Sequence, residues 1–289
     1  MNRRSPIDQR NLMNCLPVLQ NLKPIIWFPL GLFFLMTVFS PTLLFAQLQP
    51  QASPQEHRPE SVSKPDKTPT KKILFIGNSF TYWRGGLDQH LKVLSEAMSP
   101  PLGYQTKAIT RGGASLKVMW KKSSAVEEIK KGKYDIVILQ EDIPETSVES
   151  FRIYSKKFVD LVRETGARPI LFMAWDYERL NWISMEEIAN AHLEVSCKLK
   201  VEVAPVGVSW ALSKKRQPDL NMYILDAEHP SVAGMYLSLL VIESTISGKS
   251  PLTRSTEKLK IKGLKQLDAK RKRYLQEVAR DALKIWKQR

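Results

Sequence analysis

Short apolar runs alternate with longer amphipathic segments over most of the chain. Four runs are nearly continuous in apolar residues, which is typical of strands buried on both faces, and they cover residues 72–76, 134–139, 169–174 and 201–206. Residues 105–109 are a further candidate strand. Apolar residues at helical spacing predict helices between the strands, over residues 87–98, 116–131, 148–165, 185–199 and 232–246. This alternation predicts an α/β fold, a three-layer α/β/α sandwich with a central parallel sheet.

The first 46 residues have the pattern of an export segment. Four lysine or arginine side chains precede an apolar run over residues 25–46, as in a secretory signal. The run is 22 residues long, which is also enough to cross a bilayer. A cleaved signal peptide and an uncleaved signal anchor therefore both remain open. In either case we expect an exported protein, secreted or periplasmic or held by an N-terminal transmembrane segment.

The rest of the chain divides by composition. Residues 47–70 are rich in Pro, Gln, Ser and Lys and lack apolar periodicity, which predicts a flexible linker. Residues 71–252 are then the folded domain, and residues 253–289 are a basic, helical C-terminal extension. The 219 residues from 71 onwards are enough for one core.

The formal charge of +15 is unevenly spread, because residues 249–289 carry +10 of it. Such a tail can bind anionic membrane or acidic glycan, and for an exported protein we expect no nucleic acid. Alternatively, its apolar stripe packs on the sandwich and leaves the charges in water. We favour packing, with weak surface contact as a secondary effect; the stripe consists of Leu267, Tyr274, Val278 and Ile285.

The two cysteines do not indicate a metal site. Cys15 precedes the apolar run, and Cys197 is expected to be a buried thiol on a helix. No CxxC pair or Cys/His cluster is present to hold zinc. We therefore expect neither a metal nor another cofactor.

Polar and small residues follow the predicted strands, whose carboxyl ends meet at one edge of a parallel sheet. A serine nucleophile needs an adjacent histidine oriented by a carboxylate, and an oxyanion needs N–H donors from a glycine-rich turn or a side-chain amide. All of these groups occur at the strand ends, in Gly77-Asn78-Ser79, Gly112-Gly113, Gln140-Glu141-Asp142 and Asp226-Ala-Glu-His229.

Elimination among the four histidines indicates the base. His57 lies in the linker, and His90 and His192 lie in predicted helices, where a polar surface face accounts for them. His229 follows Asp226 by three residues in a loop bounded by proline. It is the histidine best placed for catalysis.

These blocks resemble those of the SGNH (GDSL-type) hydrolases. Gly77-Asn78-Ser79-Phe80-Thr81 is similar to their first block, Gly112-Gly113 to the second, and Asp226-x-x-His229 to the last. The resemblance covers residues 72–252, and an uncharacterised bacterial branch is closer still on four short pieces, Ile76-Gly-Asn-Ser-Phe-Thr81, Leu139-Gln-Glu141, Pro205-Val-Gly207 and His229-Pro-Ser231.

The resemblance implies a flavodoxin-like sandwich and a triad made of Ser79, Asp226 and His229. It also implies an oxyanion hole made of Ser79, Gly113 and Gln140. Two positions depart from the family pattern, because Asn78 replaces the usual Asp and Gln140 stands where Asn is usual. The choice between Gly112 and Gly113 stays open, with Gly113 preferred.

Aromatic residues crowd the same edge, and Trp83 and Trp175 are candidates for a substrate wall, although core packing explains aromatic residues equally well.

The sequence thus predicts an ester hydrolase with an acyl-serine intermediate. Its expected substrate is an O-acyl, in particular acetyl, group on an envelope or extracellular carbohydrate. The alternative is a non-catalytic module of the same fold that binds glycan or an anionic surface.

Overall fold

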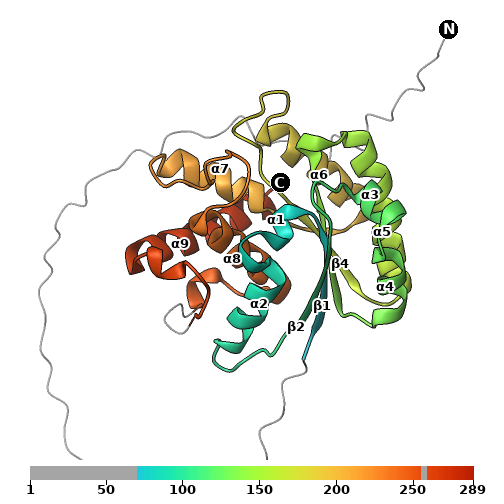
Figure 1. Ribbon diagram of the computed structural model, residues 1–289, viewed down its shortest axis with the longest axis horizontal. Coiled ribbons are helices and arrows are strands. Elements are labelled where there is room, and N and C mark those ends of the chain that lie inside the picture. Colours follow the sequence, from blue (N-terminus) through green and yellow to red (C-terminus); the bar gives the residue numbers. More distant parts are fainter. Residues whose placement is uncertain (1–69, 255–258) are drawn as a thin grey trace, which may run out of the picture. The chain divides into compact units, whose positions relative to one another are not determined.

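The computed structural model describes residues 70–254 and 259–289, so the predictions for residues 1–46 and almost all of 47–70 lie outside the described residues. One parallel sheet of five strands in the order β2-β1-β3-β4-β5 forms its centre. This confirms the predicted fold class (Figure 1). The strands are β1 (Lys72–Gly77), β2 (Gln105–Thr110), β3 (Ile136–Glu141), β4 (Arg168–Met173) and β5 (Glu202–Ala204).

Helices cover both faces of the sheet, as Figure 1 shows. On one face lie α2 (Leu87–Glu96), α7 (Val206–Arg216), α8 (Val232–Ser247) and α9 (Ala269–Lys287). On the other lie α3 (Leu116–Lys122), α4 (Ala125–Gly132), α5 (Val148–Glu164) and α6 (Met185–Leu199). The short elements are α1 (Ser79–Tyr82) and the 3₁₀ turns η1 (Trp83–Gly85), η2 (Ile143–Glu145), η3 (Pro251–Thr253) and η4 (Leu264–Gln266).

Strand β1 shows why the apolar runs are continuous. Ile73 and Phe75 pack in the core on the α8 side, whereas Leu74 and Ile76 pack in the core on the α5 side. Successive side chains of a strand point to opposite faces, and both faces are covered. Every position of this strand between its ends is therefore apolar.

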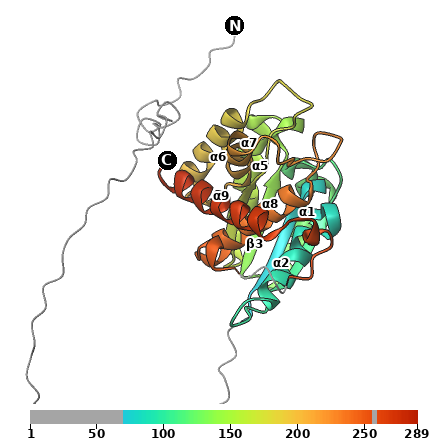
Figure 2. The same cartoon turned by 90° about the vertical axis from the view of Figure 1, so that its left-hand side faces the viewer.

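The basic tail contributes a helix to the same body. Helix α9 lies beside α7 and α8 (Figure 2). Leu275, Val278, Ala279 and Ala282 are fully buried, and Leu267 is buried as well. Tyr274 and Ile285 are partly buried and pack against the core, so the predicted stripe packs on the sandwich, as favoured.

Two elements differ from the prediction. The helix expected over residues 116–131 is two helices, because the Ser123 hydroxyl donates to the Met119 carbonyl at 2.5 Å and accepts from the Ala125 N–H at 3.1 Å. These bonds replace the helical ladder at the break. The strand predicted over residues 201–206 is shorter, because β5 covers only Glu202–Ala204 and α7 begins at Val206 after its cap Pro205, which has no N–H to donate to a strand ladder.

The surface positions predicted for two histidines are wrong. His90 is 7% exposed and His192 is 1% exposed. The Nε2 atom of His90 lies 2.9 Å from the Arg84 carbonyl oxygen, and Nδ1 of His192 lies 2.8 Å from that of Ile188. A carbonyl of the same helical region thus binds one nitrogen of each ring, while Nε2 of His192 is buried without a hydrogen-bond partner among residues 70–254 and 259–289. Cys197 lies on a helix as predicted, but it is exposed rather than buried.

Within residues 70–254 and 259–289, no helix has the length and apolar character needed to cross a membrane. The apolar run over residues 25–46 lies outside this part of the chain.

Candidate active site

Ser79 lies on a tight turn between β1 and α1. The strand ends at Gly77, Asn78 caps the helix by accepting the Phe80 N–H at 3.0 Å, and Ser79 is the first helical residue. A Cβ atom at position 77 would lie 2.5 Å from the Gln140 Oε1 and Thr81 Oγ1 atoms, so only glycine fits there. The turn brings Ser79 to the carboxyl edge of the sheet, where it remains 7% exposed.

Asp226 and His229 form a tightly organised loop. The Oδ1 atom of Asp226 accepts the backbone N–H groups of Glu228 and His229 at 3.0 and 2.9 Å, and Oδ2 lies 2.8 Å from Nδ1 of His229. Partial burial favours a protonated Asp226, but these N–H groups and the imidazole outweigh it and lower the pKa. With Nδ1 bound to the carboxylate, Nε2 remains to act as a base.

The loop adopts a backbone conformation that ordinary residues seldom take. Ala227, between Asp226 and Glu228, has φ of 56°, and the left-handed region costs a residue with a Cβ about 1–2 kcal/mol. The hydrogen bonds to Asp226 hold this conformation. Strained backbone of this kind is common at functional sites.

The residues that follow Ser79 hold the His229 loop against the Ser79 turn. Trp83 stacks on the His229 ring with 3.9 Å between centroids, and Phe80 meets the same ring edge-on at 5.8 Å. Arg84 Nε donates to the Pro230 carbonyl at 2.9 Å. The structure thus brings Ser79 and His229 into one region. It shows no hydrogen bond between their side chains in the described residues, and such bonds often tighten only when substrate binds.

The glycine turn after β2 offers backbone donors. Gly113 has φ of 60°, and no atom lies within 4 Å of the position its Cβ would occupy. A Cβ at Gly112 would lie 3.2 Å from the Tyr82 hydroxyl. Within the described residues, the N–H groups of Ser79, Gly112 and Gly113 make no backbone hydrogen bond. All three are therefore candidate oxyanion donors.

Gln140 has partners that the sequence does not predict. It is fully buried at the end of β3. Its Oε1 atom accepts the Asn78 N–H at 2.8 Å and the Thr81 hydroxyl at 3.2 Å, while Nε2 donates to the Glu141 carbonyl at 3.1 Å. Gln140 thus supports the Ser79 turn from behind and does not face an open space.

Two buried carboxyl groups lie next to Gln140. Asp142 accepts from the Asn78 side chain and from the Tyr177 hydroxyl, each at 2.6 Å. Burial raises the pKa of Asp142 to about 6 and that of Glu141 to about 7. Both were predicted at a strand end, but their partners were not: Asp142 supports the Ser79 turn through Asn78, whereas the Glu141 carboxylate accepts the N–H groups of Leu116 and Asp142. In the described part of the chain, no cluster of His, Cys, Asp and Glu could hold a metal ion.

The substrate-wall prediction is wrong for Trp175. Its ring is fully buried and stacks on Trp210 with 3.7 Å between centroids, and its Nε1 donates to the Glu228 carbonyl at 2.9 Å. Trp175 therefore supports the His229 loop from the core. Trp83 is half-buried at the site. Leu225, next to Asp226, is fully exposed and is not among the predicted site residues.

No protein-family model matches the chain, and no curated protein matches it. Several solved structures do. A DUF4886 family protein from Bacteroides uniformis aligns with a TM-score of 0.59 at 16% identity, covering 74% of this chain and 95% of that one. A protein from Slackia heliotrinireducens, provisionally assigned to the SGNH hydrolases, aligns with a TM-score of 0.53 at 22% identity, covering 62% and 100%. An acetyl-xylooligosaccharide esterase mutant from Geobacillus aligns with a TM-score of 0.51 at 17% identity, covering 63% and 97%. The protein therefore has the fold of the SGNH hydrolases.

Proposed function

We propose that the protein is a serine ester hydrolase that acts through an acyl-serine intermediate. The observation that supports this most is the Asp226–His229 pair, 2.8 Å apart, whose imidazole stacks on Trp83 four residues after Ser79. A serine, a histidine and a carboxylate at one edge of the sheet are the groups that acyl transfer needs.

The proposed reaction has two halves. Nε2 of His229 takes the hydroxyl proton of Ser79 as Oγ attacks the ester carbonyl, and the same proton then passes to the departing alcohol. Water, deprotonated by His229, releases the acid and restores the Ser79 hydroxyl. Asp226 holds the imidazole and stabilises its positive charge in both halves.

The N–H groups of Ser79 and Gly113 are the proposed oxyanion donors. Removing one such donor typically costs about 10²–10³ in kcat. Gln140 was expected to be a third donor, but the hydrogen bonds of its amide favour a positioning role. By accepting the Asn78 N–H it fixes the backbone on which the Ser79 donor lies.

The proposed substrate is an O-acyl, in particular acetyl, group on an envelope or extracellular carbohydrate. Export is predicted by the N-terminal segment, and half-buried Trp83 offers a ring beside His229 on which a sugar can pack. The acetyl-xylooligosaccharide esterase of the same fold supports this choice.

A fluorophosphonate probe tests the proposal, since it labels only an activated serine. We expect the full chain to be labelled and Ser79→Ala to be unlabelled. The control Ser147→Ala, at the N-cap of α5, is expected to be labelled like the wild type. An unlabelled wild type that binds acetylated glycan would instead support the non-catalytic module.

A further inference from the structure

A broad basic hollow of about 1170 Å³ lies where β4 and β5 begin, whereas Ser79 lies where β1 ends. Eight lysine or arginine side chains and one glutamate line it. The cations come from separate parts of the chain, among them Lys71 before β1, Lys200 after α6, and Lys284 and Lys287 on α9. The hollow thus gathers charges that are dispersed in the sequence.

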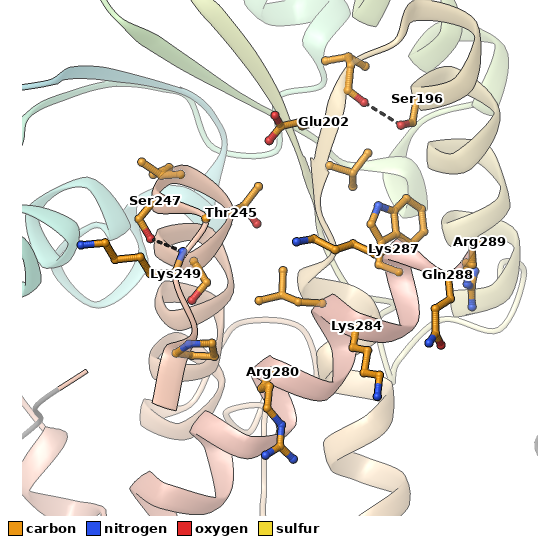
Figure 3. A pocket seen from close by; sticks show the side chains of 18 of the residues that line it. Ser196, Glu202, Thr245, Ser247, Lys249, Arg280, Lys284, Lys287, Gln288 and Arg289 are labelled. Atoms are coloured by element: carbon orange, nitrogen blue, oxygen red, sulfur yellow. Dashed lines mark hydrogen bonds between the residues drawn. The ribbon is translucent and has the colours of Figure 1, made fainter. Parts of the chain in front are cut away.

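Most of this charge is not neutralised within the protein. Arg168 pairs with Glu202 and donates to the carbonyls of Thr245 and Ile246, and Arg280 pairs with Asp281 at 2.7 Å. The structure shows no ion pair for any of the five lysines in the described residues. Figure 3 shows Lys287 extending into the hollow, with Lys249 and Lys284 at its rim.

Helix ends account for part of this positive charge. The C-termini of α6, α8 and α9 reach the hollow, and cations stabilise the carbonyl end of a helix. Each helix end is equivalent to about half a negative charge. Three helix ends, Glu202 and Asp281 together supply about 3.5 negative charges, fewer than the eight cationic side chains, so a positive excess remains.

The chemistry of the hollow favours a surface over a small ligand. Lysine is a flexible, hydrated point charge rather than a rigid donor fork, so five lysines around a wide opening do not define one small anion. A surface carrying many phosphates matches them better. Trp286, half-buried in the lining, belongs to a residue type that favours the membrane interface.

We propose that this hollow binds the anionic phospholipid headgroups of a bilayer. Lys71 lines it, and only 24 residues separate the apolar run ending at Ala46 from Lys71. The predicted membrane-directed segment therefore joins the domain at the hollow. Docking here leaves the edge that carries Ser79 and His229 uncovered.

Hydrogen exchange of the full chain on vesicles tests this proposal, because it reports which surface is covered however the N-terminal segment binds. On vesicles of phosphatidylcholine with about 30% phosphatidylglycerol, residues 244–251 and 280–289 should exchange several-fold more slowly than on phosphatidylcholine alone. About 0.5 M salt should remove the difference, because it screens the charges.

A triple variant, Lys249→Gln, Lys284→Gln and Lys287→Gln, should lose this protection. Each cation changes the affinity for an anionic surface about fivefold, so removing three should weaken vesicle binding about a hundredfold and abolish the several-fold protection. The control, Lys262→Gln, Lys265→Gln and Lys270→Gln, removes the same charge from exposed positions outside the hollow and should keep the protection.

Four results would overturn the proposal. Equal exchange on both vesicles would exclude headgroup binding, and equal loss in both triple variants would mean that only total charge matters. Protection by a soluble acidic polysaccharide at matched charge, without protection by anionic vesicles, would assign the hollow to glycan. A lowered melting temperature of the hollow variant without any change in lipid protection would leave only the helix-end role.

Discussion

The two ends of the sheet are built in different ways. Where the strands end, charged groups have fixed partners, as in Asp226 with His229 at 2.8 Å and Asp142 with Asn78 at 2.6 Å. Where β4 and β5 begin, Lys249, Lys284 and Lys287 line an open hollow, and none of them has an ion-pair partner among the described residues. Side chains held in a fixed geometry are suited to catalysing one reaction, whereas flexible lysine side chains are suited to binding an extended anionic surface. Substitutions at the first end should therefore change turnover, and those at the second should change only binding.

The largest expected effect is at Ser79 and His229. Ser79→Ala and His229→Ala should each lower kcat toward a small soluble acetyl ester about 10⁴-fold or more, because triad members act as a unit. The double variant should be scarcely worse than either single one. Circular dichroism should show an intact fold. If Ser79→Ala retained more than about a hundredth of the wild-type kcat, Ser79 would not be the nucleophile.

Gln140→Met separates positioning from direct oxyanion binding. We expect kcat to fall about tenfold to a hundredfold, together with the melting temperature, because the buried Asn78 N–H loses its acceptor at a cost of about 1–3 kcal/mol. Thr81→Val, which removes only the 3.2 Å bond to the same oxygen, should have a smaller effect on both. A fall of about 10²–10³ in kcat at an unchanged melting temperature would instead indicate an oxyanion donor.

Glu141→Gln tests whether the buried carboxyl group of Glu141 makes the stability of the protein depend on pH. Burial raises the pKa of Glu141 from 4.5 to about 7, so between these values the folded state holds more protons than the unfolded chain. Its contribution to stability is therefore present below about pH 4.5 and is lost as pH rises to about 7. The full loss is on the order of 3 kcal/mol.

The measurement is the melting temperature of wild type and Glu141→Gln at pH 5 and pH 8. Glutamine keeps the oxygen that accepts the Leu116 and Asp142 N–H groups but does not titrate, so the variant should gain stability relative to wild type as pH rises. The wild type alone would not isolate Glu141, because burial also lowers the pKa of His192 to about 4. That shift makes stability rise with pH in the range where Glu141 makes it fall, and it is the same in both proteins. A difference independent of pH would contradict the assigned burial of Glu141.

The sequence predicts the layers and the main site groups because both depend on local patterns. Continuous apolar runs indicate strands covered on both faces, and Asp-x-x-His places a carboxylate and an imidazole on one turn. The sequence does not predict burial where contacts formed in the folded core determine it. His192 is buried because the Ile188 carbonyl and Phe151 accommodate its ring, and Trp175 is buried because Trp210 stacks on it.

The same limit applies to Gln140 and to the basic hollow. The amide of Gln140 is a candidate oxyanion donor by type, and only the close approach of Gly77 and Asn78 shows that it is engaged elsewhere. The charge of the tail is visible in the sequence, but its convergence with Lys71 and Lys200 depends on where α6 and β1 lie in the fold.

The smallest expected effect on turnover comes from the core between the two ends. Leu275 of α9 is fully buried, so Leu275→Ala should cost about 2–5 kcal/mol of stability, or several degrees of melting temperature. Lys270→Gln, at an exposed position of the same helix, should leave the melting temperature unchanged. We expect kcat at 25 °C to stay within about twofold in both variants.

Helix α9 could affect the position of His229 through α8, so the kcat of Leu275→Ala also tests whether the α8–α9 core positions the imidazole. Helix α9 packs on α8, and α8 begins at its cap Ser231, two residues after His229. The loop itself is held by Asp226, by Trp83 and by the Arg84 bond to Pro230, and none of these contacts involves α9. A loosened α9 should therefore lower stability without moving His229. A fall in kcat of tenfold or more in Leu275→Ala, at a temperature where the variant is folded, would show that the α8–α9 core also sets the position of the imidazole.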